Sequence, residues 1–340
     1  MPVWDPLGPD RFLRELQGLS RREAAVACWQ REHNAFASVL SGPDTCLQLQ
    51  RCADGGVQLL KPPAMAAMAL SRRQPLLQLL AMAEALGLPA QGQTLGLQLH
   101  DEQPRHARLL HFDAAFARSA PSFGGVPDPY CLASRGFLLL RQAWRHTPLP
   151  PWSQRHDRVI WRGSSTGLPA LDRHRLLQLP RYRLCRRLQQ LEGCDARFTA
   201  VVQAASSQAD HDLRQELQAD GLLTERLAPE QLAAHRWLLD IDGNVNSWGL
   251  LWKLLSGSCV LRVQSARGQW FHHRLRAYEH LVPIRADLSD LEVCIDWCRS
   301  HPRACAAIAA AGQRLAIQVL EELGADLLTA LRWAAAAPAA

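Results

Sequence analysis

The stretch HRWLLDIDGNVNSWGLLWKLLSGSCVLRVQ, residues 235–264, decides the fold of the second half of the chain. An apolar run ends in Asp240 and Asp242, a turn rich in Gly and Asn follows, and a second apolar run leads to CVLRVQ. A strand, a turn, a helix and another strand in this order indicate a βαβ unit, because parallel strands need a crossover connection. The sequence therefore predicts a parallel sheet with this turn at the carboxyl end of a strand.

The same alternation continues on both sides of this unit. The predicted elements are strands at 158–164, 196–202, 235–242, 259–264 and 281–287, and helices at about 170–190, 208–218, 246–256, 269–276 and from 289 onward. Strands that alternate with helices predict a mostly parallel sheet covered by helices on both faces. We therefore expect a Rossmann-like α/β domain in this half of the chain.

The first half follows a different pattern. A helix is predicted over 10–40, a hairpin over 45–61 around Asp54-Gly55-Gly56, and a second helix over 64–86. The alternating run TLGLQLHD predicts a strand that ends at Asp101. The segment PLPP opens a stretch, 148–155, that favours extended backbone and marks the domain boundary. The expected domains are 1–150, 151–315 and an alanine-rich C-terminal segment, 316–340, that packs back on the first.

Composition excludes several classes of protein. The 340 residues are 48% hydrophobic and 21% charged, which is typical of folded proteins. The net charge of +6 comes without an RNP, zinc-finger or basic-zipper pattern, so we expect no nucleic-acid partner. The ten cysteines lack paired spacing, and the start MPVWDPLGPDRFLREL lacks the apolar core of a signal peptide, so we expect a cytoplasmic protein with reduced thiols. Membrane contact, if any, would be peripheral.

Several polar segments are candidates for chemistry. In WRGSSTG, residues 161–167, backbone N–H groups, hydroxyls and one Arg suit a diphosphate, although a solvated turn would look the same. In the turn after Asp240, Asn246 or Ser247 could cap the following helix, and Asp240-Ile241-Asp242 also spells a DxD motif that could hold a divalent metal. Three histidines could bind or catalyse, or only structure their loops: His272, His273 and His280.

The joint pattern of these segments resembles a known family. The segments are WRGSSTG, DIDGNVNSWGLLWKLLSGSCVL, QWF, EHLVPIRADLSDLEVCIDW and RACAAIAAAGQRLA, in this order. They resemble glycosyltransferase family 90, which includes CAP10-like proteins, protein O-glucosyltransferases and bacterial LpsA-type lipopolysaccharide glycosyltransferases. The resemblance covers about 155–315 and is faint over 95–135. It is greatest to the bacterial branch.

The resemblance implies a GT-B architecture, in which two Rossmann-like domains face a central cleft and the second binds a nucleotide sugar, usually a UDP-sugar, without a metal or another cofactor. It makes the DxD motif a strand end and a turn whose carboxylates serve hydrogen bonds. One departure is Gly249, which stands where eukaryotic members carry an Arg towards the diphosphate. The nucleotide-sugar site that the resemblance implies consists of Arg162, Gly163, Ser164, Arg181, Asp242, Gly243, Asn244, Asn246 and Ser247.

The resemblance extends to an acceptor side in the first domain. LHDEQP, residues 99–104, is similar to the family's strand-end Asp and makes Asp101 the catalytic base, with Glu102 and Asp113 as rivals on chemical grounds. APSFGG and PDPY are similar to acceptor loops, with candidates Ser122, Phe123, Asp128 and Tyr130. We therefore expect an inverting, metal-independent glycosyltransferase that uses a glycan or lipopolysaccharide-type glycolipid as acceptor. The alternatives are a non-catalytic nucleotide-sugar or glycan binder, and a Rossmann oxidoreductase, which the absence of GxGxxG disfavours.

Overall fold

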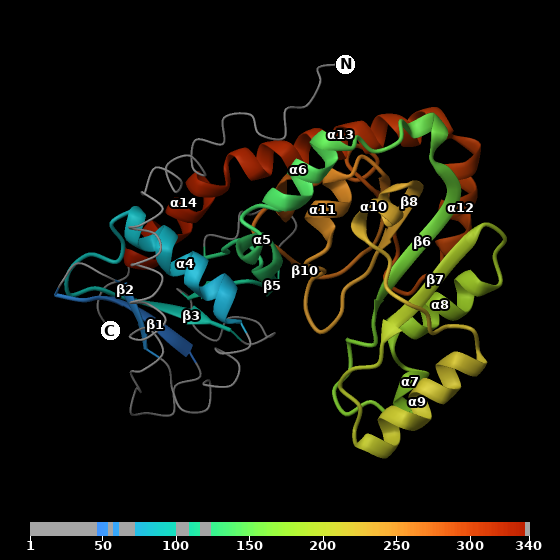
Figure 1. Ribbon diagram of the computed structural model, residues 1–340, viewed down its shortest axis with the longest axis horizontal. Helices are drawn as coiled ribbons and strands as arrows, with labels where there is room; N and C mark the ends of the chain where they lie inside the picture. The colour runs from blue at the N-terminus through green and yellow to red at the C-terminus, as the bar shows by residue number, and fades with distance from the viewer. Residues whose placement is uncertain (1–45, 54–56, 61–71, 100–108, 116–123, 337–340) are drawn as a thin grey trace. The chain divides into compact units, whose positions relative to one another are not determined.

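The computed structural model describes residues 46–53, 57–60, 72–99, 109–115 and 124–336. The chain divides into two compact units (Figure 1). Unit 1 contains Met1–Thr147, Arg267–His273 and Gln318–Ala340, and unit 2 contains Pro148–Ala266 and Arg274–Ile317. The division falls at Pro148, inside the predicted boundary stretch. The segment Arg267–His273 differs from the expectation, because the predicted second domain, 151–315, includes it.

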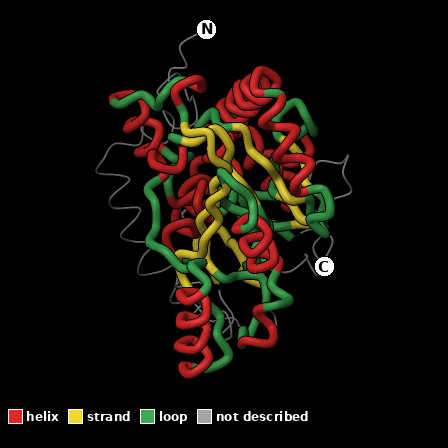
Figure 2. The backbone as a smooth tube through the Cα atoms, turned by 90° about the vertical axis from the view of Figure 1, so that its right-hand side faces the viewer, coloured by secondary structure: helices red, strands yellow, loops and turns green. Residues whose placement is uncertain are grey.

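Unit 2 is built around a five-stranded sheet in the order β11-β9-β8-β6-β7. Every neighbouring pair is parallel. The strands are β6 (His156–Ser164), β7 (Cys194–Ala200), β8 (His235–Asp240), β9 (Cys259–Val263) and β11 (Val282–Ile284). All five predicted strands of this half are present, and Figure 2 shows them lying side by side with the twist of a parallel sheet.

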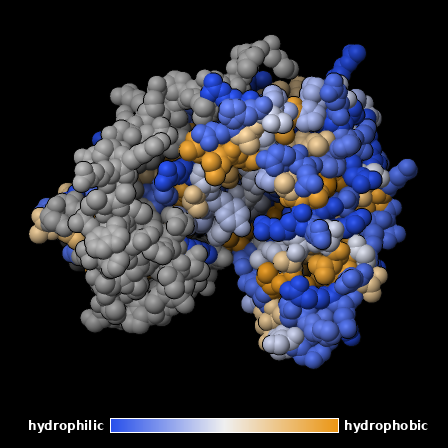
Figure 3. Space-filling view, viewed as in Figure 1, coloured by the Kyte–Doolittle hydropathy of each residue, from blue (hydrophilic) through white to orange (hydrophobic). Residues whose placement is uncertain are grey.

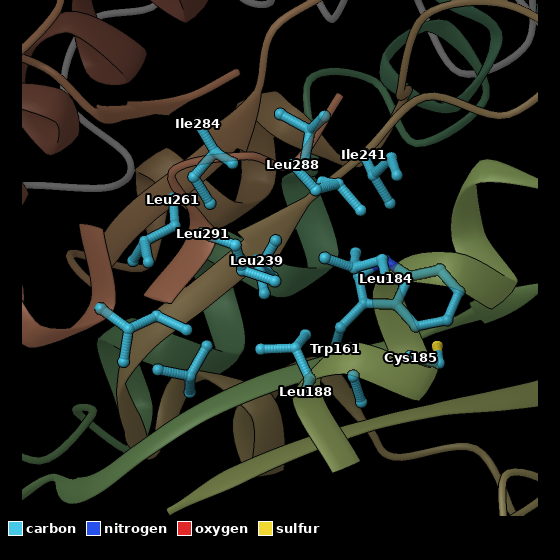
Figure 4. Close-up of a cluster of buried hydrophobic side chains, with 14 of the residues drawn as sticks. Trp161, Leu184, Cys185, Leu188, Leu239, Ile241, Leu261, Ile284, Leu288 and Leu291 are labelled. Carbon is cyan, nitrogen blue, oxygen red and sulfur yellow. The ribbon is translucent and has the colours of Figure 1, made fainter. Parts of the chain in front are cut away.

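Both faces of this sheet are covered. Val159 and Trp161 of β6 belong to the large core cluster, whereas Ile160 between them packs with Leu232 and Leu238 in a separate cluster. Successive side chains of a strand point to opposite faces, so the two clusters lie on the two sides of the sheet. Figure 4 shows Trp161 beside Leu184 and Cys185 of helix α8 (Pro180–Gln189) within the large cluster. On the face seen in Figure 3, the surface of unit 2 is mostly hydrophilic with separate hydrophobic patches.

The helices of unit 2 follow most of the predicted positions and differ from them at several points. The predicted helix 170–190 is two helices, α7 (Arg173–Leu176) and α8, because Asp172 caps the first through the Arg175 N–H and Pro180 begins the second. The predicted helix 269–276 is wrong: it is reduced to a 3-10 turn, η3 (His272–Arg274). The Gln269 backbone donates to the His272 ring instead, and Arg267–Gly268 (β10) form a strand. The other helices are α9 (Ser207–Ala219), which extends past the strand ends in Figures 1 and 2, α10 (Pro229–Ala233), α11 (Leu250–Leu255), α12 (Leu291–Ser300) and α13 (Pro302–Glu321). The last residues of α13, from Gln318, belong to unit 1.

Unit 1 has a mixed sheet. Strands β1 (Cys46–Arg51) and β2 (Val57–Leu60) form the predicted antiparallel hairpin, and β3 (Thr94–Gln98) pairs antiparallel with β1 and parallel with β4 (Leu110–His111). The resemblance implied a Rossmann-like first domain, whereas the described sheet of unit 1 contains antiparallel pairs. Its core also contains Leu327 and Leu331 of α14 (Leu323–Ala335). The remaining elements are α4 (Arg73–Ala85), β5 (Ala114–Ala115), α5 (Pro129–Ala133), α6 (Leu138–His146) and the 3-10 turn η2 (Trp152–Gln154) of unit 2. The predicted helix 10–40 lies outside the described residues.

Candidate functional site

The strand order of unit 2 creates a switch point between β6 and β8. From β6 the chain crosses to β7 on one side, whereas from β8 it crosses to β9 on the other. The loops that leave the carboxyl ends of β6 and β8 therefore diverge, and open α/β sheets bind their ligands where this occurs. The two loops at this point are 164–167 and 241–247, which are the segments that the sequence singled out as polar.

The loop after β6 is held in place by its own small residues. The Ser165 hydroxyl donates to the Val202 carbonyl over 3.0 Å and accepts from the Val202 N–H over 2.8 Å, which ties the loop to the end of β7. The Gly163 position has no room for a larger residue, because a Cβ there would overlap the indole of Trp161. Gly167 has a φ of 134°, in a region that favours glycine. Close approach requires glycine at the end of β6, and an unusual backbone conformation favours it in the loop.

The turn after β8 is closed by hydrogen bonds around Asp242. Its Oδ1 accepts from the Ser247 backbone N–H over 2.8 Å, and the Gly243 N–H donates to the Val245 carbonyl over 3.0 Å. Helix α11 consequently begins only at Leu250, and the prediction that Asn246 or Ser247 caps it is wrong. The Ser247 hydroxyl instead donates to Asp240 Oδ1 over 2.6 Å. Tertiary bonds to the strand end therefore replace the local cap.

Arg181 of α8 joins the two loops. Its Nη1 donates to the Ser164 carbonyl over 2.9 Å and to the Thr166 hydroxyl, and its Nε donates to the Asp242 carbonyl over 2.9 Å. The guanidinium carbon lies 5.5 Å from the ring centre of Trp161. Burial lowers the pKa of Arg181 to about 10, against the opposing effect of Asp240 and Asp242, so the group is a cation at neutral pH.

A buried charge cluster lies directly behind the turn. Lys253 Nζ is 2.6 Å from Asp240 Oδ1, and Arg262 Nη1 is 2.6 Å from Asp240 Oδ2. The other end of the Arg262 fork binds Asp242 Oδ1. Burial raises the pKa of Asp240, but Lys253 and Arg262 together outweigh it and lower the value to about 2. The Asp240 carboxylate is thus ionised, and both carboxylates of the DxD motif are bound to cations of the same chain.

No group of three or more His, Cys, Asp or Glu within the described ranges has an arrangement that could hold a metal ion. The metal reading of the DxD motif is tested further by the contacts above. A divalent ion at Asp240 would have to displace Lys253 or Arg262, since each Asp240 oxygen already has a cationic partner. The donor set therefore fits an internal ion-pair network better than a metal centre.

Arg162, predicted at the diphosphate, is engaged elsewhere. Its Nη2 lies 2.7 Å from Asp195 Oδ2, and its Nη1 donates to the carbonyls of Trp161 and Asp195. Burial raises the pKa of Asp195, but its hydrogen bond from Arg162 and the charges of Arg162 and Arg197 outweigh this and hold the pKa below the usual value. The Gly249 position lies beside the buried charge cluster of Lys253, Arg262 and Asp240, since a Cβ there would be 3.7 Å from Lys253 Nζ.

The predicted acceptor-side residues belong to unit 1. Asp101, Glu102, Ser122 and Phe123 lie outside the described residues. Asp128 is fully buried and caps α5, with Oδ1 accepting from the N–H groups of Tyr130 at 2.8 Å and Cys131 at 3.0 Å. Burial raises the pKa of Asp128 to about 7 although these bonds oppose the shift. Tyr130 is exposed.

Two further sets of candidates have structural partners. The rival base Asp113 is buried, and its Oδ2 lies 2.9 Å from Arg267 Nη1. The histidine rings structure their own loops: His272 Nδ1 accepts from the Gln269 N–H, His273 Nδ1 lies 3.0 Å from the Trp270 carbonyl oxygen, and His280 Nδ1 accepts from the Arg276 N–H. These contacts favour the structural interpretation of the histidines.

Sequence reasoning missed three residues of this site, Thr166, Lys253 and Arg262. The signal for two of them was present: Lys253 stands inside LLWKLL and Arg262 inside CVLRV, and ionised residues in apolar runs are buried only when paired. The partners could not be read from the sequence, because Arg262 and Asp240 are 22 residues apart on neighbouring strands.

The model of glycosyl transferase family 90 matches residues 138–324 of this chain. Protein O-glucosyltransferase 2 of Danio rerio is 25% identical over 167 residues, which are 49% of this chain and 30% of that protein. Uncharacterized protein 035R of Invertebrate iridescent virus 3 is 31% identical over 163 residues, 46% of this chain and 14% of that protein. The chain therefore spans less than a third of the length of either relative.

Among solved structures, Anabaena Alr3699/HepE in complex with UDP-glucose is similar with a TM-score of 0.35 and 15% sequence identity. The similarity covers 55% of this chain and 50% of that one. Across the described part of the chain, no helix is both long enough and apolar enough to cross a membrane.

Proposed function

The chain belongs to glycosyl transferase family 90, and on this premise we propose that it is an inverting glycosyltransferase that moves a sugar from a UDP-sugar to a hydroxyl of a glycan or lipopolysaccharide-type glycolipid. The observation that carries the proposal is the pair of joined polar loops, 164–167 and 241–247, at the switch point of the parallel sheet. Ligands of open α/β sheets bind at this position. Because the relative in Danio rerio is a protein O-glucosyltransferase, UDP-glucose is the first donor to test.

The donor would bind against the two loops of unit 2. Backbone N–H groups and the small residues Ser164, Gly243 and Asn244 would contact the nucleotide sugar, where larger residues would leave no space. The role assigned to Asp242 and Ser247 is to keep the turn closed, as their mutual hydrogen bond indicates. Asn246, which is buried in the same turn, completes the proposed site.

The transfer is proposed to need no metal ion. Asp240 is neutralised by Lys253 and Arg262, and Asp242 shares Arg262, which supports a role for both carboxylates in shaping the turn. Stabilisation of the leaving diphosphate then depends on oriented N–H dipoles and on charges from other parts of the protein.

Asp101 is proposed as the catalytic base. It would accept the proton of the acceptor hydroxyl while that oxygen forms a bond to the anomeric carbon and the bond to the UDP oxygen breaks on the opposite face. This single displacement inverts the anomeric configuration and leaves UDP as the second product. Asp113, the alternative base within the described residues, is paired with Arg267, and this supports Asp101 as the base.

A non-catalytic nucleotide-sugar binder is the second candidate, and one observation favours it. Arg162, Arg181, Lys253 and Arg262 each bind acceptors of the protein itself, and Gly249 replaces the family's Arg. A weakly neutralised diphosphate would be a poor leaving group. A GT-B arrangement of the two units, a cytoplasmic location and peripheral membrane contact remain parts of the proposal that stem from the family.

The test is transfer and hydrolysis of UDP-, GDP- and ADP-sugars with EDTA present, for the wild type, Asp101→Asn and the matched control Asp157→Asn, whose side chain is exposed. We expect turnover of a UDP-sugar by the wild type and the control, and its loss in Asp101→Asn. Activity that EDTA abolishes and Mn²⁺ restores would contradict metal independence. Binding of a UDP-sugar without turnover, with glycolipid acceptor present, would favour the second candidate.

A further inference from the structure

We propose that Arg181 is a positioning residue that holds the two donor loops together, and that it sets the affinity for the whole nucleotide without touching the diphosphate. The proposal rests on the function proposed above. It reverses the sequence expectation, which placed the Arg181 charge on the nucleotide.

The guanidinium is almost completely used by the protein. Of its five N–H groups, Nε donates to the Asp242 carbonyl, both Nη1 hydrogens go to Ser164 and Thr166, and Nη2 donates to the Ile241 carbonyl over 3.1 Å. Two of these acceptors lie in the loop after β6 and two in the turn after β8. The planar fork of Arg suits this arrangement, because it directs several donors from one rigid group.

Two more observations indicate that the loops are in close contact. The Gly167 N–H donates to Asn244 Oδ1 over 2.8 Å, which is a second link between the same loops. A Cβ at Gly243 would overlap Thr166 Oγ1 and lie 2.9 Å from Arg181 Nη2. The loops therefore approach each other around the guanidinium so closely that only glycine fits at position 243. Removing the hydrogen bonds of the guanidinium would let the loops separate.

Positioning and direct binding predict different ligand profiles. If Arg181 holds the loops, its loss weakens the binding of UMP and of UDP by a similar factor, because the surface that binds both nucleotides is disturbed. If Arg181 contacts the second phosphate, its loss weakens the binding of UDP and leaves the binding of UMP unchanged. The two roles also differ for Arg181→Lys, which keeps the charge but loses the fork.

The first experiment is calorimetric titration with UMP and with UDP, in EDTA, of the wild type, Arg181→Gln, Arg181→Lys and the control Arg183→Gln, an exposed Arg of the same helix. We expect a loss of about tenfold in affinity for both nucleotides in Arg181→Gln and in Arg181→Lys, and no change in the control. Selective loss of UDP affinity, or full rescue by Lys, would overturn the proposal.

A double-mutant cycle with Asn244→Ala tests the shared role of the two links. Because both hold the same pair of loops, the combined loss should be smaller than the product of the single losses. Independent effects would overturn the proposal. If Arg181→Gln fails to fold, Thr166→Val removes one acceptor only and should weaken UMP and UDP equally, by twofold to fivefold.

Hydrogen–deuterium exchange gives a readout that needs no ligand. In Arg181→Gln, amides of 163–167 and 241–247 should exchange faster, while those of β9 stay as in the wild type. Unchanged exchange in both loops would overturn the proposal. If the exchange result holds but the wild type binds neither UMP nor UDP, the proposed function has failed and the loop-positioning role stands.

Discussion

Lys253 Nζ lies 2.6 Å from Asp240 Oδ1, and both side chains are buried in unit 2. A buried carboxylate is tolerated only when cations and hydrogen bonds replace its water, and Asp240 obtains both from Lys253, Arg262 and Ser247. The strand end of β8 is therefore fixed by charge as well as by the sheet.

Lys253→Met should lower the free energy of unfolding by about 3 kcal/mol, because it leaves Asp240 Oδ1 without its cation in a buried position. Urea denaturation at pH 7 measures the effect. In the double variant Lys253→Met, Asp240→Asn the unpaired charge is gone, so the loss should be smaller than the sum of the two single losses. Additive losses would contradict a direct pair.

Asp128 should make unit 1 less stable as the pH rises. Burial raises its folded pKa to about 7 from an ordinary value of 3.8, so the folded state retains a proton that the unfolded chain has released. The stability contribution is complete below pH 4 and is lost as the pH rises through 7, at about 1.4 kcal/mol per pH unit within this window.

Asp128→Asn keeps a capping side chain and removes the titration. Its free energy of unfolding relative to the wild type should therefore increase between pH 5 and pH 7 and level off above, as measured by urea unfolding at each pH. Asp172→Asn, at the cap of α7 in unit 2, is the matched control. Parallel pH profiles for the wild type and Asp128→Asn would refute the prediction.

Gly243→Ala should disturb the contact between the two loops. The added Cβ overlaps the Thr166 hydroxyl, and overpacking of this kind costs about 2 kcal/mol. We expect weaker UDP binding by calorimetry and partial recovery in Gly243→Ala, Thr166→Ala, where the hydroxyl is absent. Arg183→Gln, at an exposed position of α8, is the control. Wild-type affinity in Gly243→Ala would show that the loops are farther apart.

Arg162→Gln should affect stability and leave nucleotide binding unchanged. Its guanidinium is bound to Asp195, so we expect a loss of about 2 kcal/mol in the free energy of unfolding and a UDP affinity within twofold of the wild type. Arg197, whose side chain is exposed, pairs with the same carboxylate, so Arg197→Gln should cost less than about 1 kcal/mol. A variant that unfolds like the wild type but binds UDP tenfold more weakly would place Arg162 at the ligand.

The elements of unit 2 could be predicted because their signals are local. Apolar runs between turn residues located all five strands of the sheet, and the hairpin of unit 1 followed from alternation around Asp54-Gly55-Gly56. The start of α11 could not be predicted in this way, because Ser247 bonds to Asp240 and not to its own helix. The helix expected over 269–276 failed for a similar reason, since Arg267–Gly268 pairs with Ala114–Ala115 across the sequence.

The sequence by itself determined the succession of strands and helices along the chain, the family, and the polar loops at two strand ends. Periodicity and turn chemistry depend on neighbouring residues, so these features can be read locally. Only the tertiary structure decided which partner each charged group takes. Arg162 pairs with Asp195 across 33 residues, and Arg181 reaches the Asp242 carbonyl across 61. Coulomb attraction and hydrogen bonding act over a few ångströms in space. Those distances are set by the order of the strands within the sheet, which no local pattern encodes.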